Sequence, residues 1–129
     1  MGQSQYLIDT NAIIDYLGNK LPLSGLNFMN GVIDALPNVS VISKIELLSF
    51  NAPEEHYITL SNFVNDTAVF DLTSNIVEAC IAIRKKHKTK LPDAIIAATA
   101  LVYDFVLISR NTSDFKPIEN LQVIDPHNL

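Results

Sequence analysis

The fold is first indicated by the run Tyr6-Leu7-Ile8-Asp9-Thr10-Asn11-Ala12-Ile13-Ile14-Asp15-Tyr16-Leu17. Three apolar residues stop at a polar tripeptide, and a second apolar stretch with the length of a short helix follows it. This pattern predicts a short buried strand, a polar turn and a helix. It is the usual beginning of an α/β unit.

The same alternation continues along the rest of the chain. Further short apolar strands are expected at residues 39–41, 68–70, 105–108 and 121–124. Helices are expected at 26–36, from Ser43, at 53–64, after a cap at Thr73 or Ser74, and from Pro92 to Tyr103. Short apolar strands that alternate with helices are typical of a parallel sheet covered on both faces. We therefore expect a three-layer α/β/α fold with a short-stranded, mainly parallel central sheet, formed by a single domain over residues 1–129.

The composition excludes several classes of protein. With 48% hydrophobic and 18% charged residues, the 129-residue chain is neither disordered nor a coiled coil. Its longest nearly continuous apolar stretch, 94–102, is shorter than the roughly 20 residues that span a bilayer. The N-terminus has no secretion signal, so we expect a cytoplasmic protein without a membrane partner. One cysteine excludes an internal disulfide, and no Cys/His cluster has the spacing of a zinc site.

The distribution of charge is more informative than its sum. Nine Lys and Arg against fourteen Asp and Glu give a net charge of −5, which disfavours a nucleic-acid partner. Five of the nine cations, however, lie in the basic segment, residues 84–90. Such a segment is most often a solvated helix end, but it can also receive the phosphates of a polyanion. The cations that we expect to contact such a polyanion are Arg84, Lys86, Lys88, Lys90 and Arg110.

Four acids lie where the strand-to-helix turns of such a sheet are expected. Ligands of parallel α/β sheets bind at the carboxyl ends of the strands, where these turns converge. The acids are therefore candidate catalytic and metal-binding residues: Asp9, Glu46, Asp93 and Asp114.

Each acid also has a purely local explanation. Asp9 could cap the first helix, and Ser43 with Glu46 matches the Ser-x-x-Glu capping box. Asp93 would lie in a first helical turn, where the helix dipole favours an acid, and Asp114 could be an ordinary turn residue. Capping does not explain why every turn at one edge supplies an acid.

Carboxylates forced together repel one another, and a hard divalent cation with oxygen ligands relieves that repulsion. We therefore expect Mg²⁺ or Mn²⁺ as the cofactor. Two such ions about 3.5–4 Å apart can hold the attacking and leaving oxygens of an in-line phosphoryl displacement. They would also change the net charge from −5 to −1, because they add +4. This is the chemistry of a nuclease.

Four motifs follow one another along the chain: Asp9-Thr10-Asn11 behind a short strand, Glu46 on an early helix, Lys90-Leu91-Pro92-Asp93-Ala94-Ile95-Ile96-Ala97-Ala98, and Ser109-Arg110-Asn111-Thr112-Ser113-Asp114-Phe115. In this set the chain resembles the PIN-domain ribonucleases, particularly the VapC-like toxins of bacterial and archaeal toxin–antitoxin pairs. The resemblance covers essentially the whole chain.

The resemblance implies a function and a set of roles. The four acids would bind the metal, and the polar residues that would support them are Thr10, Asn11, Ser109 and Asn111. Ser109 stands where these toxins often have threonine, so a hydroxyl is kept. The resemblance also implies an endoribonuclease, a homodimer, and a cognate antitoxin whose C-terminal arm covers the site.

Other functions fit the sequence less well. A phosphatase of the haloacid-dehalogenase type needs a second aspartate where Asn11 stands, and a response-regulator receiver needs a neighbouring acid pair. A non-catalytic PIN-like module that binds RNA or an antitoxin remains the main alternative. The isolated His56, His87 and His127 are expected at the surface, because a metal-bound water needs no histidine base.

Overall fold

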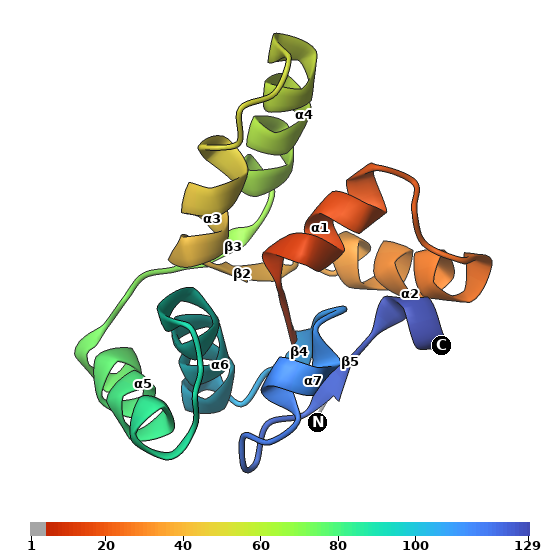
Figure 1. Ribbon diagram of the computed structural model, residues 1–129. Helices are drawn as coiled ribbons and strands as arrows, with labels where there is room; N and C mark the ends of the chain where they lie inside the picture. Colours follow the sequence, from red (N-terminus) through yellow and green to blue (C-terminus); the bar gives the residue numbers. More distant parts are fainter. Residues whose placement is uncertain (1–4) are drawn as a thin grey trace.

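The computed structural model describes residues 5–129 and has an α/β architecture (Figure 1). Its helices and strands, in chain order, are β1 (Tyr6–Ile8), α1 (Thr10–Leu17), α2 (Leu23–Asp34), β2 (Asn38–Ser40), α3 (Val41–Leu48), α4 (Glu54–Asn65), β3 (Ala68–Phe70), α5 (Ser74–Lys86), α6 (Leu91–Tyr103), β4 (Val106–Ile108), α7 (Thr112–Phe115), β5 (Val123–Ile124) and the 3₁₀ helix η1 (Pro126–Asn128). No helix within the described residues is long and apolar enough to cross a membrane.

The five strands form one sheet in the order β3-β2-β1-β4-β5, and every neighbouring pair is parallel. At the centre, β1 pairs with β4 in the register Leu7 to Leu107 and Ile8 to Ile108. The expectation of a short-stranded parallel sheet is confirmed.

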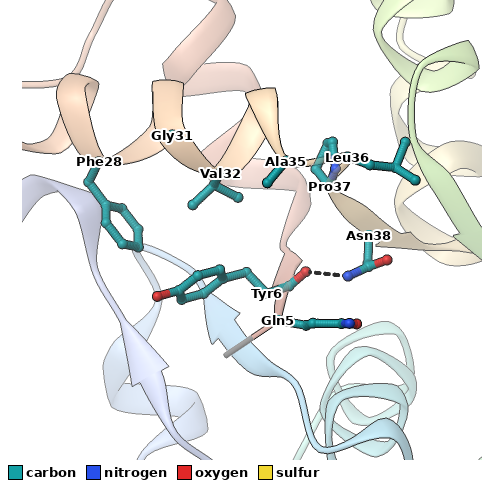
Figure 2. A pocket seen from close by; sticks show the side chains of 9 residues that line it. All are labelled: Gln5, Tyr6, Phe28, Gly31, Val32, Ala35, Leu36, Pro37 and Asn38. Atoms are coloured by element: carbon teal, nitrogen blue, oxygen red, sulfur yellow. Dashed lines mark hydrogen bonds between the residues drawn. The ribbon is translucent and has the colours of Figure 1, made fainter. Parts of the chain in front are cut away.

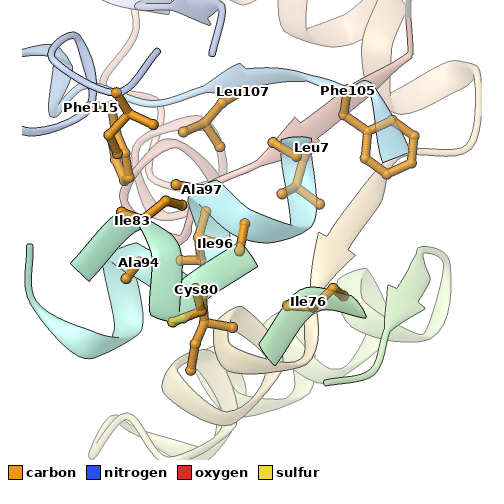
Figure 3. Close-up of a cluster of buried hydrophobic side chains, with 14 residues drawn as sticks. Leu7, Ile76, Cys80, Ile83, Ala94, Ile96, Ala97, Phe105, Leu107 and Phe115 are labelled. Carbon is orange, nitrogen blue, oxygen red and sulfur yellow. The ribbon is translucent and has the colours of Figure 1, made fainter. Parts of the chain in front are cut away.

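Successive residues of each central strand point to opposite faces of the sheet, as the pleat requires. Leu7 and Leu107 pack under α5 and α6. Figure 3 shows both leucines within a cluster of buried apolar side chains. Ile8 and Ile108 pack on the other face, against α1 to α4. The α6 residues 94–100 are all buried, which agrees with a helix that is apolar on every side. The three layers are therefore helices, sheet and helices.

The second strand and the third helix differ from the sequence expectation. The strand ends at Ser40 and the helix begins at Val41, two residues before the expected start at Ser43. The reason is a cap, since the backbone N–H of Ile42 donates to Ser40 Oγ at 3.1 Å. In addition, Thr112–Phe115 forms a short helix, α7, in place of the expected turn.

Candidate active site

The parallel topology brings all four sequence-predicted acids to one edge of the sheet. Asp9 follows β1 directly, α3 with Glu46 follows β2, and α7 with Asp114 follows β4. Helix α6 leads into β4 and runs back along the sheet, so its first turn with Asp93 lies at the same edge (Figure 1). The charges interact, because Asp9 is repelled by Asp93 and Glu46, and Asp93 by Asp114 and Glu46.

Asp9 is the buried member of the set, with 4% of its surface exposed. Its Oδ1 accepts from the backbone N–H of Thr10 at 2.8 Å. Its Oδ2 accepts from Ser109 Oγ at 2.8 Å and from Asn11 Nδ2 at 3.3 Å. Burial raises the pKa of Asp9 to about 6, the Ser109 and Thr10 hydrogen bonds oppose this rise, and the other acids add to it.

Asp93 is half-buried in the first turn of α6. Burial is the main cause that raises its pKa, and repulsion by Asp114 and then Glu46 adds to the rise. Lys90, three residues earlier, opposes it. Two of the four acids therefore resist ionisation in the protein by itself, and a cation at this edge would reverse that effect.

Glu46 and Asp114 are exposed, and each is oriented by a polar neighbour. Thr10 Oγ1 lies 2.6 Å from Glu46 Oε1, and Asn111 Nδ2 donates to Asp114 Oδ2 at 2.8 Å. Together with the Asn11 and Ser109 contacts to Asp9, the structure places every expected supporting residue within hydrogen-bonding distance of an acid.

The local explanations of the acids hold in part. Asp9 is the N-cap of α1, and Asp93 and Asp114 lie in first helical turns. Glu46 belongs to no capping box, because Ser40 caps α3. Ser43 is fully buried instead, and its Oγ lies 2.9 Å from Thr10 Oγ1. This role of Ser43 is absent from the sequence predictions, although Ser43 and Glu46 are three residues apart and therefore share a helix face.

The carboxylate oxygens of the four acids are the kind of ligand that a hard divalent cation prefers. Four carboxylates face one edge, and within residues 5–129 none of them forms an ion pair with Lys, Arg or His. The same residues contain no three His, Cys, Asp or Glu side chains gathered closely enough to hold an ion. A metal would therefore have to draw the carboxylates closer together.

The expected RNA-binding residues are exposed, and they lie in two places. Arg84 and Lys86 end α5, and Lys88 and Lys90 follow in the connection to α6, so the basic segment adjoins the helix start that carries Asp93. Lys86 Nζ lies 3.8 Å from Glu119 Oε1, an exposed pair. Arg110 lies apart from this segment, in the turn after β4.

His127 differs from the expectation of an isolated surface residue. Its Nε2 lies 2.9 Å from Oδ2 of Asp15, a buried acid of α1 that is absent from the sequence-predicted site residues. Arg110 Nη1 contacts the same carboxylate at 3.0 Å. Sequence offers one signal for Asp15, because it is an acid between Ile14 and Tyr16 in the apolar part of that helix.

A cavity of about 620 Å³ lies at the opposite edge of the sheet, where β1 and β2 begin (Figure 2). Among the described residues, its lining includes Tyr6, Phe28 and Asn38 but no carboxylate or cationic side chain. Asn38 Nδ2 donates to the carbonyl of Tyr6 at 3.0 Å beside it. Within residues 5–129, the cavity therefore has no contact with the acids and offers no group for acid–base or metal chemistry.

Comparisons with known proteins agree with this geometry. Residues 6–120 match the family model of the PIN domain. Among solved structures, the chain is similar to one in a toxin-antitoxin complex from Klebsiella pneumoniae, with 28% identity, a TM-score of 0.75, and coverage of 97% of this chain and 100% of the other. It is also similar to a chain of VapBC-1 from nontypeable Haemophilus influenzae, with 25% identity, a TM-score of 0.76 and coverage of 94% and 97%. A chain of DNA-bound VapBC from Salmonella typhimurium shares the fold, with 22% identity, a TM-score of 0.80 and coverage of 96% and 99%. A search of curated proteins gives no match.

Proposed function

The chain belongs to the PIN domain family, and on this basis we propose that it is a metal-dependent endoribonuclease that hydrolyses RNA phosphodiester bonds. The observation that carries the proposal is the placement of Asp9, Glu46, Asp93 and Asp114 at one sheet edge, where none has a cationic partner among the described residues. A structural role alone would not favour four acids that repel one another.

In the proposed reaction the four carboxylates hold Mg²⁺ or Mn²⁺. The bound metal would supply an acidified water and neutralise charge on the phosphate that is attacked. Ser109 and Asn11 fix the orientation of the Asp9 carboxylate, and Thr10 fixes that of Glu46. Such outer contacts orient the ligands of a metal and maintain their charge.

The basic segment would hold the RNA beside this edge. Lys88 and Lys90 are exposed and lie just before the first turn of α6, so they can contact phosphates flanking the one that is cut. Each such contact adds affinity that does not depend on the base sequence.

We also propose that the chain is the toxin of a toxin–antitoxin pair and that it forms a homodimer. The similar chains from Klebsiella pneumoniae and Haemophilus influenzae come from such complexes, which supports a protein partner. Co-expression with the product of the neighbouring reading frame should yield a stable complex in which RNA cleavage is suppressed. Separate elution of the two proteins would contradict the pairing.

One observation favours an alternative. Because no three acids in the described residues are gathered closely enough to hold an ion, a PIN-like module that binds RNA or an antitoxin without cutting fits the structure as it stands. The two functions differ in whether RNA is cleaved when metal is added.

The test is cleavage of a mixed-sequence single-stranded RNA by the purified protein. We expect cleavage with Mg²⁺ or Mn²⁺, none with excess EDTA, and none by Asp93→Asn with either metal. Asp104→Asn is the matched control. Asp104 is the C-cap of the same helix, and its left-handed backbone conformation (φ 57°) suits asparagine. Cleavage by Asp93→Asn at the control's rate, or cleavage in EDTA, contradicts the metal mechanism. Binding of intact RNA under all conditions supports the non-catalytic module.

A further inference from the structure

Asp15 is a buried acid outside the four-acid set. Its side chain is 4% exposed and is met by two basic groups. Arg110 Nη1 lies 3.0 Å from Oδ2 and 3.3 Å from Oδ1, and His127 Nε2 lies 2.9 Å from Oδ2. A buried carboxylate without such partners would be strongly destabilising. The two contacts from Nη1 to Asp15 hold the Arg110 guanidinium in place.

Arg110 is also fixed through its backbone. Its N–H donates to Asn11 Oδ1 at 3.1 Å, while Nδ2 of the same Asn11 donates to Asp9. Asn11 and Asp15 are four residues apart in α1, so they lie on the same face, about one 5.4 Å turn apart. The Arg110 side chain therefore runs along α1 from the acid site to a point one turn away.

Only part of the guanidinium is used by these contacts. Nη1 is the atom that binds Asp15, and within residues 5–129 neither Nε nor Nη2 has a hydrogen-bond acceptor. The Arg110 side chain remains 56% exposed. A planar guanidinium that is held through one nitrogen can still donate from the other two, so it is suited to bind a phosphate oxygen.

We infer that Asp15 is a positioning residue that holds Arg110 for a phosphate of the RNA neighbouring the one that is cut. The inference rests on the proposed function, since it assigns a substrate contact to the same site. Arg110 contacts the RNA, and Asp15 acts only through Arg110.

His127 has a different role in the cluster, because it anchors the C-terminal segment. Gly25 in α2 allows this segment to approach, since a Cβ there would lie 1.8 Å from the carbonyl oxygen of Pro126. Ser24 Oγ donates to the carbonyl of Leu129 at 2.6 Å. His127 thus offers a matched control, which disturbs the Asp15 cluster without removing the contact to Arg110.

The test is the salt dependence of binding to a single-stranded RNA, measured with Mg²⁺ in an Asp93→Asn background so that the RNA stays intact. Arg110→Gln should lower the slope of log K against log[salt] by about 0.7, the value for one phosphate of a single strand that is no longer neutralised. Asp15→Asn should lower it equally, and the double variant should lower it no further. His127→Asn should leave the slope unchanged. Arg110→Lys keeps one positive charge, so it should keep the wild-type slope but bind the RNA more weakly, because an ammonium has no second nitrogen that reaches the phosphate while the first pairs with Asp15.

Several results would overturn the inference: a wild-type slope in Arg110→Gln or Asp15→Asn, additive effects in the double variant, or an equal loss in His127→Asn. If Asp15→Asn does not fold, the RNA affinity of Arg110→Lys decides, and an affinity equal to that of the unsubstituted residue would overturn the inference. Cleavage by the protein without these substitutions is measured in parallel. Failure of cleavage together with the expected changes in slope refutes the nuclease and keeps the Arg110 contact, whereas absence of RNA binding refutes both.

Discussion

Burial of Asp9 opposes the ionisation that a metal ligand requires. Its carboxylate caps α1, and the proposed metal needs it ionised, while burial raises its pKa from 3.8 to about 6. The folded state holds the Asp9 proton more tightly than the unfolded state does. Protonation of Asp9 therefore adds to the free energy of unfolding, and this contribution is complete below pH 3.8. It is lost as the pH rises through about 6.

Asp9→Asn should therefore stabilise the metal-free protein at pH 7. Asparagine keeps the cap and removes the buried charge, whose cost corresponds to at most about 3 kcal/mol. The gain should shrink as the pH falls and vanish near pH 4, where Asp9 of the unsubstituted protein is neutral. Denaturant unfolding in EDTA between pH 4 and pH 7 measures the difference. A variant that is less stable by the same amount at every pH would mean that Asp9 serves only as a cap.

The hydroxyl of Thr10 offers a second prediction for a single side chain. Its Oγ1 lies 2.6 Å from Glu46 Oε1, and loss of a group that orients a metal ligand typically costs about 10- to 100-fold in metal affinity or activity. Thr10→Val should free Glu46 and lower kcat about tenfold or more, with RNA binding unchanged. Thr10→Ser, which keeps the hydroxyl, should restore most of the rate. Equal rates in the Val and Ser variants would show that the contact to Glu46 has no role in cleavage.

Individual elements show how far the sequence predicts the structure. The β1–α1 unit is predictable because an apolar run, a capping acid and a helix follow one another locally. Val-Ser-Val favours a strand that includes Val41, but Ser40 caps Ile42 and the helix begins at Val41. The Asp15–His127 contact joins residues 112 apart, and no local pattern indicates it. Local signals therefore predict the elements and the edge that the acids share, whereas an individual tertiary contact such as Asp15–His127 has no counterpart in the sequence pattern.

The end of α5 carries a prediction about RNA binding. Replacing Lys86, Lys88 and Lys90 together with glutamine should weaken RNA binding and reduce its salt slope by about 0.7 for each phosphate that these lysines neutralise. The affinity for Mn²⁺ should not change. Lys20→Gln, in the connection between α1 and α2, is the control and should leave the slope as it is. If the triple variant keeps the wild-type slope, these lysines are only solvated.

At the scale of the whole molecule, a parallel sheet explains how an acidic chain could bind a polyanion. All five strands end at one edge, so turns far apart in sequence place their acids together, and the basic segment adjoins them through α6. The overall charge of −5 then matters less than the charge at this edge once metal is bound. The proposed nuclease function depends on the four acids acting as one metal site.

Thermal unfolding with and without Mn²⁺ tests this claim most directly. An ion that binds only the folded state adds about 2.7 kcal/mol of stability at a hundredfold excess over Kd. We predict that Mn²⁺ raises the Tm of the unsubstituted protein and of Asp104→Asn equally, and that it raises the Tm of Asp93→Asn much less. An equal response of all three proteins to Mn²⁺, or no response in any of them, would contradict a metal site built from these acids.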